Sequence, residues 1–217
     1  MIFEVSKTAP RDIYNMMIGL VAPRPIAWIT SMDAKGKLNA APFSAFNYVA
    51  IDPPMVAIGV AHRPGQGLVP KDTGINIRET GEFVINIACE EMAEQMNICA
   101  VDFPKGVNEI EVAGLRTEPS SVVKVPRLAD APACLECREH STIQVGTSNI
   151  VLGRVVAFHV QDRFIDPAGP YVKAEEVHAI GRMNGLGHYV RTRDAFFNMP
   201  RQTYQEWLKT NPPPPGA

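Results

Sequence analysis

The stretch RPIAWITSMDAKGKLNAAPFSAFNYVAIDPP, residues 24–54, decides how the fold of this 217-residue chain is interpreted. It opens with IAWITSM, whose apolar and β-branched residues predict a strand, and DAKGK then predicts a turn at Gly36. The segment NAAPFSAFN that follows is small, apolar and hydroxyl-bearing, and it carries no charge. A regular strand would contain more β-branched residues and a surface loop more charge, so this segment needs a different explanation.

The bulk composition is that of a globular protein and excludes several classes of function. Apolar residues make up 46% of the chain and charged residues 20%, and the net charge of −2 supplies no basic field for nucleic acid. No apolar run approaches the ~20 residues of a membrane span. The start, MIFEVSKTAPRD, lacks the basic-then-apolar pattern of a signal peptide, so we expect a cytoplasmic protein with no nucleic-acid or membrane partner.

Strands dominate the rest of the chain and follow one another as hairpins. They are expected at residues 26–32, 55–61, 83–88, 134–146 and 149–166, the last two joined by TSN. Strands in hairpins, without regular strand–helix alternation, predict a mainly β fold, an antiparallel barrel with peripheral helices. The amino-acid composition does not change in a way that would mark a second domain. We therefore expect one domain over residues 1–195 and a C-terminal helix with a proline-rich tail over 196–217.

Four helices are expected around this barrel. Residues 8–23 give the first, with Thr8 as cap and Pro10 in its first turn, and residues 71–81 the second, opened by Asp72 or Thr73 and closed by Gly81. Residues 89–100 give the third, and residues 198–210 the last, with Asn198 near its cap and Pro200 in its first turn. The apolar residues of the first form one stripe: Ile13, Met16, Met17 and Leu20.

Standard catalytic and metal-binding motifs are missing from the sequence. The five histidines have no metal-ligand spacing, and His159 is interpreted as a strand-face residue. Cys134 and Cys137 form a C-x-x-C without the second close pair that a zinc site would need. Both lie in an expected strand, which points them to opposite faces. We therefore name no catalytic side chain and no metal ligand.

The segment HRPGQGLVPKDT, residues 62–73, offers the ingredients of a phosphate site. Arg63 and Lys71 supply cations and Thr73 a hydroxyl, beside a helix start with free N–H groups. Asp72 would repel a phosphate, so it is interpreted as the helix cap. Taken alone, a solvated charged loop explains this segment better.

The opening segment fits the edge of a flat heterocycle. Small side chains leave room over a ring, and Asn39, Ser44 and Asn47 can form hydrogen bonds. Pro42 is expected to hold its backbone off a regular ladder and so free neighbouring groups for a ligand. A small-residue strand packed under a helix explains the segment equally well.

Taken together, these motifs resemble the flavin reductase-like family of FMN-binding split-barrel proteins. The resemblance lies in RPIAWITS, NAAPFSAFN, DPP, KDT and TGEFVINI, and it continues through GVNEIEVAGL, DAPACLEC and HAIGRMNGLGHYVRT. These ordered motifs cover residues 23–189. The resemblance implies a split β-barrel that forms a homodimer and holds FMN without a covalent bond.

The resemblance also implies roles for particular residues. The first strand ends beside the flavin, the opening segment lines its ring, and the loop before the second helix holds its phosphate. The implied FMN-binding residues are Thr30, Ser31, Asn39, Ala41, Pro42, Phe43, Ser44, Asn47, Arg63, Lys71, Asp72, Thr73 and Arg182, the last in the late glycine-rich segment. His178 is implied at the nicotinamide pocket.

The implied activity is the transfer of hydride from NADH or NADPH to FMN, with a monooxygenase or another electron-transfer protein as partner. An FMN electron carrier reduced by a protein, with little nicotinamide activity, is the alternative, since neither needs an extra motif. An oxidase of the pyridoxamine-phosphate type would want a more basic phosphate site. A haem-binding barrel would want a well-placed axial histidine.

Overall fold

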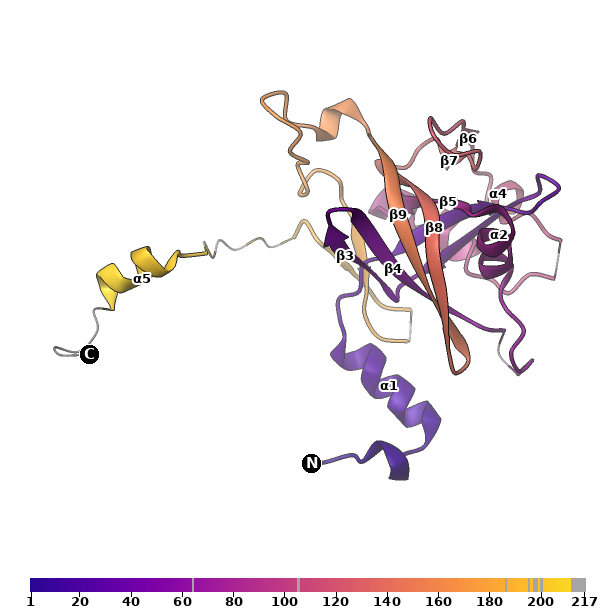
Figure 1. Cartoon of the computed structure of the whole chain (residues 1–217), viewed down its shortest axis with the longest axis horizontal. Coiled ribbons are helices and arrows are strands. Elements are labelled where there is room, and N and C mark those ends of the chain that lie inside the picture. Colours follow the sequence, from indigo (N-terminus) through magenta and orange to yellow (C-terminus); the bar gives the residue numbers. More distant parts are fainter. Residues whose placement is uncertain are drawn as a thin grey trace.

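The body of the protein is a curved antiparallel sheet of seven strands (Figure 1). The computed structural model describes residues 1–63, 65–104, 106–185, 187–194, 196, 199 and 201–211. The strands are ordered β2-β1-β5-β8-β9-β4-β3, so β2 and β3 form two open edges. This arrangement confirms the mainly β fold and the split barrel predicted from the sequence.

The bounds of the sheet strands follow the apolar runs of the sequence. They are β1 Ala27–Met32, β2 Leu38–Phe43, β3 Phe46–Ile51, β4 Pro54–Ala61, β5 Glu82–Ile87, β8 Ala133–Val145 and β9 Ser148–Val160. Two short pairs lie outside the sheet: β6 Thr117–Glu118 with β7 Arg127–Leu128, and β10 Ile180–Arg182 with β11 Tyr189–Arg191.

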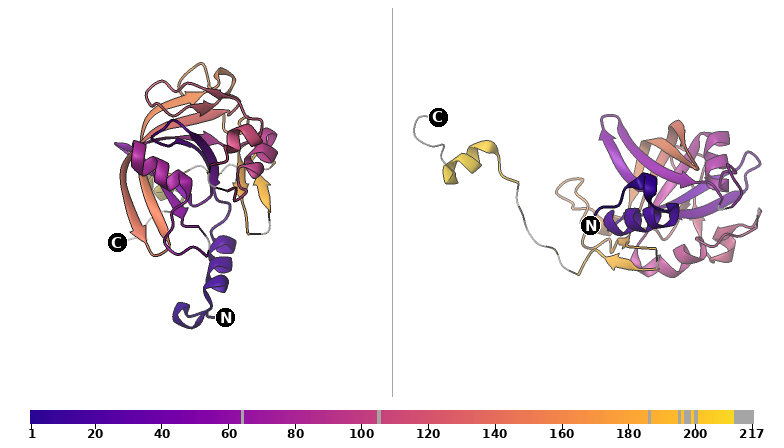
Figure 2. Two further views of the ribbon diagram at one scale, coloured as in Figure 1. Left: turned by 90° about the vertical axis from the view of Figure 1, so that its right-hand side faces the viewer. Right: turned by 90° about the horizontal axis from the view of Figure 1, so that it is seen from below.

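Most of the helices lie around the sheet, and the last one lies apart from it, as Figures 1 and 2 show. They are α1 Pro10–Leu20, α2 Asp72–Thr80, α3 Ala93–Ile98, α4 Glu109–Val112 and α5 Tyr204–Thr210, with 3-10 turns η1 Val5–Lys7, η2 Glu90–Met92 and η3 Asp162–Phe164. Helix α2 packs against β1 and β2 and ends at Gly81, which has a φ of 70°. No described helix is both long and apolar enough to cross a membrane.

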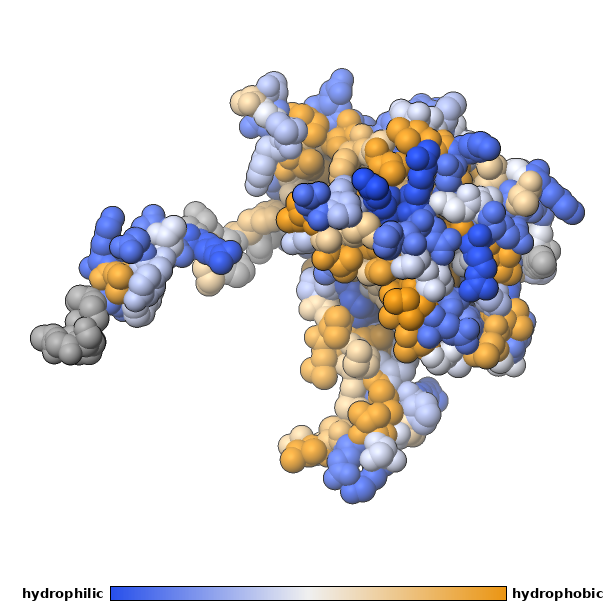
Figure 3. Space-filling view, viewed as in Figure 1, coloured by the Kyte–Doolittle hydropathy of each residue, from blue (hydrophilic) through white to orange (hydrophobic). Residues whose placement is uncertain are grey.

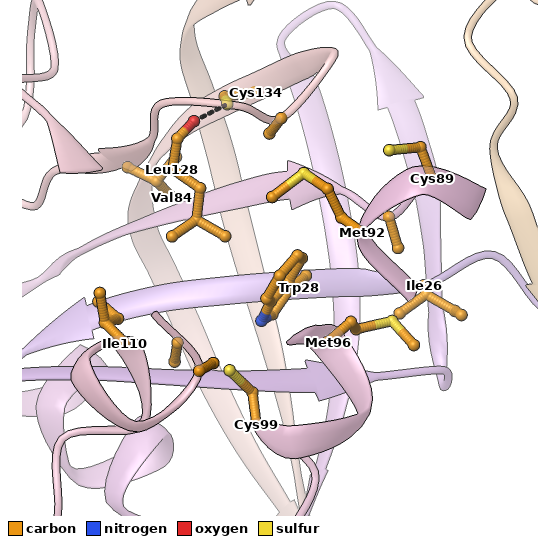
Figure 4. Close-up of a cluster of buried hydrophobic side chains, with 14 of the residues drawn as sticks. Ile26, Trp28, Val84, Cys89, Met92, Met96, Cys99, Ile110, Leu128 and Cys134 are labelled. Atoms are coloured by element: carbon orange, nitrogen blue, oxygen red, sulfur yellow. Dashed lines mark hydrogen bonds between the residues drawn. The ribbon is translucent and has the colours of Figure 1, made fainter. Parts of the chain in front are cut away.

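Two apolar clusters pack on opposite faces of the sheet. One surrounds Trp28 and receives Met92, Met96 and Cys99 from the η2–α3 segment, as Figure 4 shows. The other surrounds Ile29 and Phe83 and takes side chains from β4, α2 and β9. Trp28 and Ile29 are neighbours in β1 and both are fully buried, because successive residues of a strand point to opposite faces.

The cysteine pair follows the same alternation. Cys134 lies in the Trp28 cluster and Cys137 in the Ile29 cluster, which confirms the prediction of opposite faces. Both are free thiols, and burial raises the pKa of Cys134 to about 12. The described residues contain no group of side chains that could hold a metal ion.

The hairpin between the two longest strands is shifted slightly from the prediction. Its turn is Gly146–Thr147, and Gly146 has a φ of 55°, in the left-handed region that favours glycine. Ser148, predicted as part of the link, already belongs to β9, one residue before the strand start predicted at Asn149.

The predicted cap of the first helix is wrong, and the last helix begins later than predicted. Ala9 caps α1 without a side-chain bond, and the Thr8 hydroxyl instead donates to the Glu4 carbonyl at 2.7 Å. Helix α5 begins at Tyr204 and is capped by Thr203, which shares a capping box with Glu206. The predicted cap residue Asn198 and the first-turn Pro200 lie outside the described residues.

Helix α1 projects from the sheet and buries none of its residues (Figures 1 and 3). Ile13 and Met16 of its predicted apolar stripe are half-buried, but Met17 is 59% and Leu20 83% exposed. The amphipathic pattern correctly predicts a helix, yet the described part of the chain leaves half of its apolar stripe largely exposed.

Candidate functional site

A groove of about 1110 Å³ runs along the open edge of β2. Its walls come from α1, the β3–β4 pair, the first turn of α2, the segment after α3, and the β10–β11 region. The predicted residues that line it are Asn39, Ala41, Pro42, Phe43, Ser44, Asn47, Arg63, Lys71, Asp72, Thr73 and Arg182. Residues predicted from three separate segments are therefore brought to one cavity, whose volume suits a cofactor-sized ligand.

Three predicted residues do not line this groove. Thr30 and Ser31 are fully buried in β1, where the Thr30 hydroxyl donates to the Pro126 carbonyl at 2.7 Å. The Ser31 hydroxyl accepts a hydrogen bond from the Asn76 amide at 3.1 Å. His178 lies outside the groove lining, and its Nδ1 contacts the Glu91 carboxylate at 2.5 Å.

Strand β2 is a regular edge strand that contains a proline. Pro42 pairs with Trp28 in regular register, so the predicted break in the ladder is wrong. Because β2 is an edge strand, the missing N–H of Pro42 points away from β1 and removes no ladder bond. The groove thus meets a regular strand edge that carries small side chains.

On the β3–β4 side of the groove, two segments of the chain approach each other closely. The Gly59 N–H donates to the Ala45 carbonyl at 2.7 Å, and a Cβ on Gly59 would lie 2.9 Å from the Ala45 Cβ. Any larger residue at position 59 would push these segments apart. Small residues at positions 45 and 59 therefore let the start of β3 lie close against β4 where both line the groove.

One end of the groove combines polar groups with the first turn of α2. The buried Thr73 hydroxyl accepts from the Asn39 amide at 3.0 Å, which ties α2 to β2. Lys71 lies 3.7 Å from Asp102, and its side chain is 34% exposed. The first N–H groups of a helix have no intrahelical partner, so this end attracts anions.

Asp72 does not cap α2 as predicted. The cap position belongs to Lys71, which makes no side-chain bond, and Asp72 is the first helical residue. The Asp72 carboxylate instead accepts from the Arg63 guanidinium at 2.9 Å. The sequence could not show this pairing, because it depends on how the loop between the two residues folds back.

Glu109 is a groove residue that sequence reasoning missed. Asn108 caps α4 by accepting from the Ile110 N–H at 3.1 Å, and this places the Glu109 carboxylate against the edge of β2. Its Oε2 accepts from the Ala40 N–H at 3.2 Å. Burial raises the pKa of Glu109, and the nearby Asp72 carboxylate raises it further. In the sequence, Glu109 is marked only by its place in GVNEIEVAGL, one of the motifs that carry the family resemblance.

Arg24 is a second missed residue, at the other end of the β2 edge. Its Nη1 donates to the carbonyls of Ile18 at 2.6 Å and Val21 at 2.9 Å, so it caps the last turn of α1. Its Nε donates to the Ser44 hydroxyl at 3.3 Å. The backbones of Arg24 and Arg182 exchange two hydrogen bonds, of 2.9 and 2.8 Å. Two flanking prolines were the only hint in the sequence.

The comparison with protein families agrees with this arrangement. The family model described as "Flavin reductase like domain" matches residues 20–176. The chain belongs to this flavin reductase-like family. Its function is therefore flavin-related redox chemistry, and it is an oxidoreductase of the split-barrel type.

Two solved structures and one curated relative are similar over most of the chain. The 2-nitrobenzoate 2-nitroreductase NbaA of Pseudomonas fluorescens is 35% identical, with a TM-score of 0.85, and the match covers 94% of this chain and 98% of that one. Component B of nitrilotriacetate monooxygenase from Bacillus cereus is 31% identical, with a TM-score of 0.85 and coverage of 91% and 98%. A more distant relative, an NADH:riboflavin 5'-phosphate oxidoreductase of Streptomyces pristinaespiralis, is 26% identical over 161 residues, 74% of this chain and 81% of its own length.

Proposed function

We propose that this flavin reductase-like protein binds FMN in the groove and reduces it with NADH or NADPH. The observation that carries the proposal is the junction at Asn39 and Thr73, which joins an anion-attracting helix start to an edge strand of small residues. The relative that acts on riboflavin 5'-phosphate, which is FMN, supports the same choice. When bound, FMN supplies the ring that accepts a hydride from the nicotinamide.

The phosphate of FMN would be held at the first turn of α2. Lys71 and Thr73 offer an ammonium group and a hydroxyl, and the helix start adds backbone N–H groups. Arg63 is held by Asp72 at 2.9 Å, so its charge is partly neutralised before any ligand arrives. Its role is to position the loop and to balance Asp72, which would otherwise repel the phosphate.

The flavin ring would lie along the edge of β2. Ala41 and Pro42 present small surfaces to it, and Ser44 and Asn47 offer side-chain hydrogen bonds. Backbone carbonyls on the free side of an edge strand can accept from the ring. The groove walls exclude water from one face, and no protein acid or base is required for hydride transfer.

We also propose that the protein is a homodimer that delivers reduced flavin or electrons to a second protein, such as a monooxygenase. On α1, Tyr14, Met17 and Leu20 expose apolar surface that the described residues leave uncovered. The similarity to a monooxygenase component supports such a partner. Light scattering at micromolar concentration should give twice the chain mass, and a monomer would contradict the dimer.

The C-terminal segment would contribute nothing to this chemistry. The family match ends at residue 176 and the described groove lining ends at Tyr189. We therefore propose that residues 196–217 lie outside the functional domain. A chain that ends at residue 195 should bind FMN with unchanged affinity.

An anaerobic titration tests the proposed activity. Purified protein is loaded with FMN, its absorbance near 450 nm is recorded, and NADH or NADPH is added. Rapid bleaching is the expected result. Bound FMN that stays oxidised with both donors would favour the electron carrier, and tighter binding of FAD than of FMN would contradict the cofactor choice.

A further inference from the structure

Two arginines meet at the end of the groove that lies away from α2. Arg24 and Arg182 face each other across a two-hydrogen-bond backbone bridge, and both line the groove. Residues directly opposite in an antiparallel pair carry their side chains on the same face. The two cationic side chains thus leave the bridge on the same face, and like charges on directly opposite residues are unfavourable unless an anion binds near them.

Neither arginine is neutralised within the described part of the chain. No described carboxylate forms an ion pair with Arg24 or Arg182, whereas Arg63 and Lys71 each have an aspartate partner. The Arg24 Nε donates to the Ser44 hydroxyl, and its Nη1 donates to two backbone carbonyls of α1 and the residue after it. Its Nη2 has no acceptor among the described residues. Arg24 and Arg182 thus lack the carboxylate partner that each cation at the proposed FMN phosphate site has.

The two ends of the groove are too far apart to serve one phosphate. Asn39 contacts Thr73 of α2, and Ser44 contacts Arg24. Five steps of nearly extended chain separate Asn39 from Ser44, roughly 16 Å at about 3.3 Å per residue. An FMN whose phosphate lies at α2 would leave the arginine pair for a different anionic group.

Aromatic rings accompany the arginine pair. The Arg182 guanidinium lies 4.6 Å from the centre of the Tyr189 ring, which fixes its plane. Tyr14 of α1 also lines the groove and is 60% exposed. Planar cations next to aromatic faces suit a ligand that joins phosphate groups to flat rings, and this is the chemistry of a dinucleotide.

We infer that Arg24 and Arg182 form a second anion subsite, which binds the pyrophosphate of the nicotinamide dinucleotide that reduces the flavin. The inference rests on the proposed function and adds to it the residues that select the electron donor. It also reassigns Arg182, which the family resemblance had implied as an FMN ligand. Arg24 has a second duty, because the same guanidinium holds the C-terminus of α1.

The test uses Arg182→Gln, because Arg182 has no second duty among the described contacts of its guanidinium. Arg191→Gln is the matched control: it changes an arginine of the same β10–β11 pair that contacts Glu90 and does not line the groove. We expect Arg182→Gln to raise the KM for the dinucleotide roughly 10-fold while kcat and the Kd for FMN stay near wild type. Arg191→Gln should leave all three unchanged, and Arg182→Lys should recover part of the KM.

Direct binding of ADP-ribose to the FMN-loaded protein separates this inference from the proposed function. ADP-ribose carries the pyrophosphate but no nicotinamide, so it reports on the subsite even if the protein does not oxidise NADH or NADPH. Wild type should bind it, increasingly weakly as salt is added, and Arg182→Gln should bind it roughly 10-fold less tightly. Equal binding by the two proteins, or a loss of FMN affinity in Arg182→Gln, would overturn the subsite. Loss of donor oxidation alone would overturn only the proposed function.

Discussion

Two buried carboxylates in this protein, Glu136 of β8 and Glu109 of α4, are held in opposite ways. Glu136 is fully buried and accepts from the backbone N–H groups of Ser121 at 2.6 Å, Val122 at 2.7 Å and Val123 at 2.9 Å. The His159 ring is its fourth partner. Burial raises the pKa of Glu136, but these hydrogen bonds outweigh burial and hold the pKa below its ordinary value.

Glu109 accepts from fewer described groups than Glu136 does, and it lines the groove. The Ala40 N–H is one of its donors, and burial leaves the pKa of Glu109 above its ordinary value. A buried carboxylate whose oxygens all accept hydrogen bonds anchors structure, and Glu136 anchors the loop that carries Val123 into the core. A buried carboxylate with fewer hydrogen bonds, such as Glu109, still has acceptor capacity that a ligand in the groove can use. The difference separates the scaffold of this protein from its groove.

The sharpest test compares two neighbouring alanines on β2. Ala41 lines the groove, while Ala40 is fully buried in the Trp28 cluster. Ala41→Phe should weaken FMN binding more than about 100-fold, because the ring would fill the ligand's space, and it should lower Tm less than Ala40→Phe because Ala41 is only partly buried. Ala40→Phe should instead cost about 1–3 kcal/mol of stability through overpacking. Wild-type FMN affinity in Ala41→Phe would show that this edge does not meet the flavin.

Glu136→Gln should be the most damaging change on the scaffold side. The amide replaces one acceptor with an N–H that faces backbone N–H groups, so we expect a loss of about 3 kcal/mol in the free energy of unfolding, the upper value for a hydrogen bond to a charged group. Since the folded-state pKa lies below 4.5, this stabilisation is complete above pH 4.5 and is lost as the pH falls below it. Urea unfolding at pH 7 and pH 4 measures both effects.

The control for Glu136→Gln is Glu175→Gln, which changes an exposed carboxylate that forms no ion pair with the described residues. It should unfold like the wild type at both values of pH. If Glu136→Gln did the same, the contrast between an anchored and an unanchored carboxylate would fail.

Lys71→Ala should weaken FMN binding roughly 10- to 100-fold, because a charge-assisted bond to a phosphate is worth about 1.5–3 kcal/mol. Its partner Asp102 is exposed, so Tm should hardly change. Lys35→Ala, on the exposed turn between β1 and β2, is the control for lost charge and should keep wild-type affinity. Flavin titration of the three proteins measures the difference, and equal affinities would remove α2 from the phosphate site.

Glu109→Gln should have the smallest effect and the opposite sign to Glu136→Gln. The folded-state pKa lies above 4.5, so the folded protein keeps a proton that the unfolded chain loses, and Glu109 lowers stability as the pH rises above 4.5. Gln keeps an acceptor for the Ala40 N–H and has no charge to bury. The variant should therefore equal the wild type in stability at pH 4.5 and be slightly more stable at pH 8. A less stable variant at pH 8 would mean that Glu109 is an anchor like Glu136.

The sequence predicted the parts of the fold that depend on local pattern. Apolar runs placed the long strands β8 and β9, and the two faces of β8 followed from the spacing of Cys134 and Cys137. Two segments, residues 39–47 and 62–73, contain most of the predicted site residues that line the groove, and the resemblance brought them together.

The missed features depend on contacts between distant segments. Glu109 reaches Ala40 across 69 residues, and Arg24 pairs with Arg182 through a backbone register that no local pattern encodes. Asp72 resembled a helix cap because aspartate favours that position, but Arg63 offers its carboxylate a better partner. Local sequence patterns predict the helices and strands, whereas these residue pairs form only when the elements pack against one another.

The outer edge of β2 also bears on how the protein avoids aggregation through an exposed strand edge when no ligand is bound. An exposed strand edge of low charge is a template for adding a foreign strand, and this leads to aggregation. The Ala40 N–H is already occupied by Glu109, and Pro42, two residues on, has no N–H to offer. An incoming strand would thus find no free N–H group at two successive outward-facing positions of β2. The edge can therefore remain unpaired and accessible to a small molecule without starting aggregation.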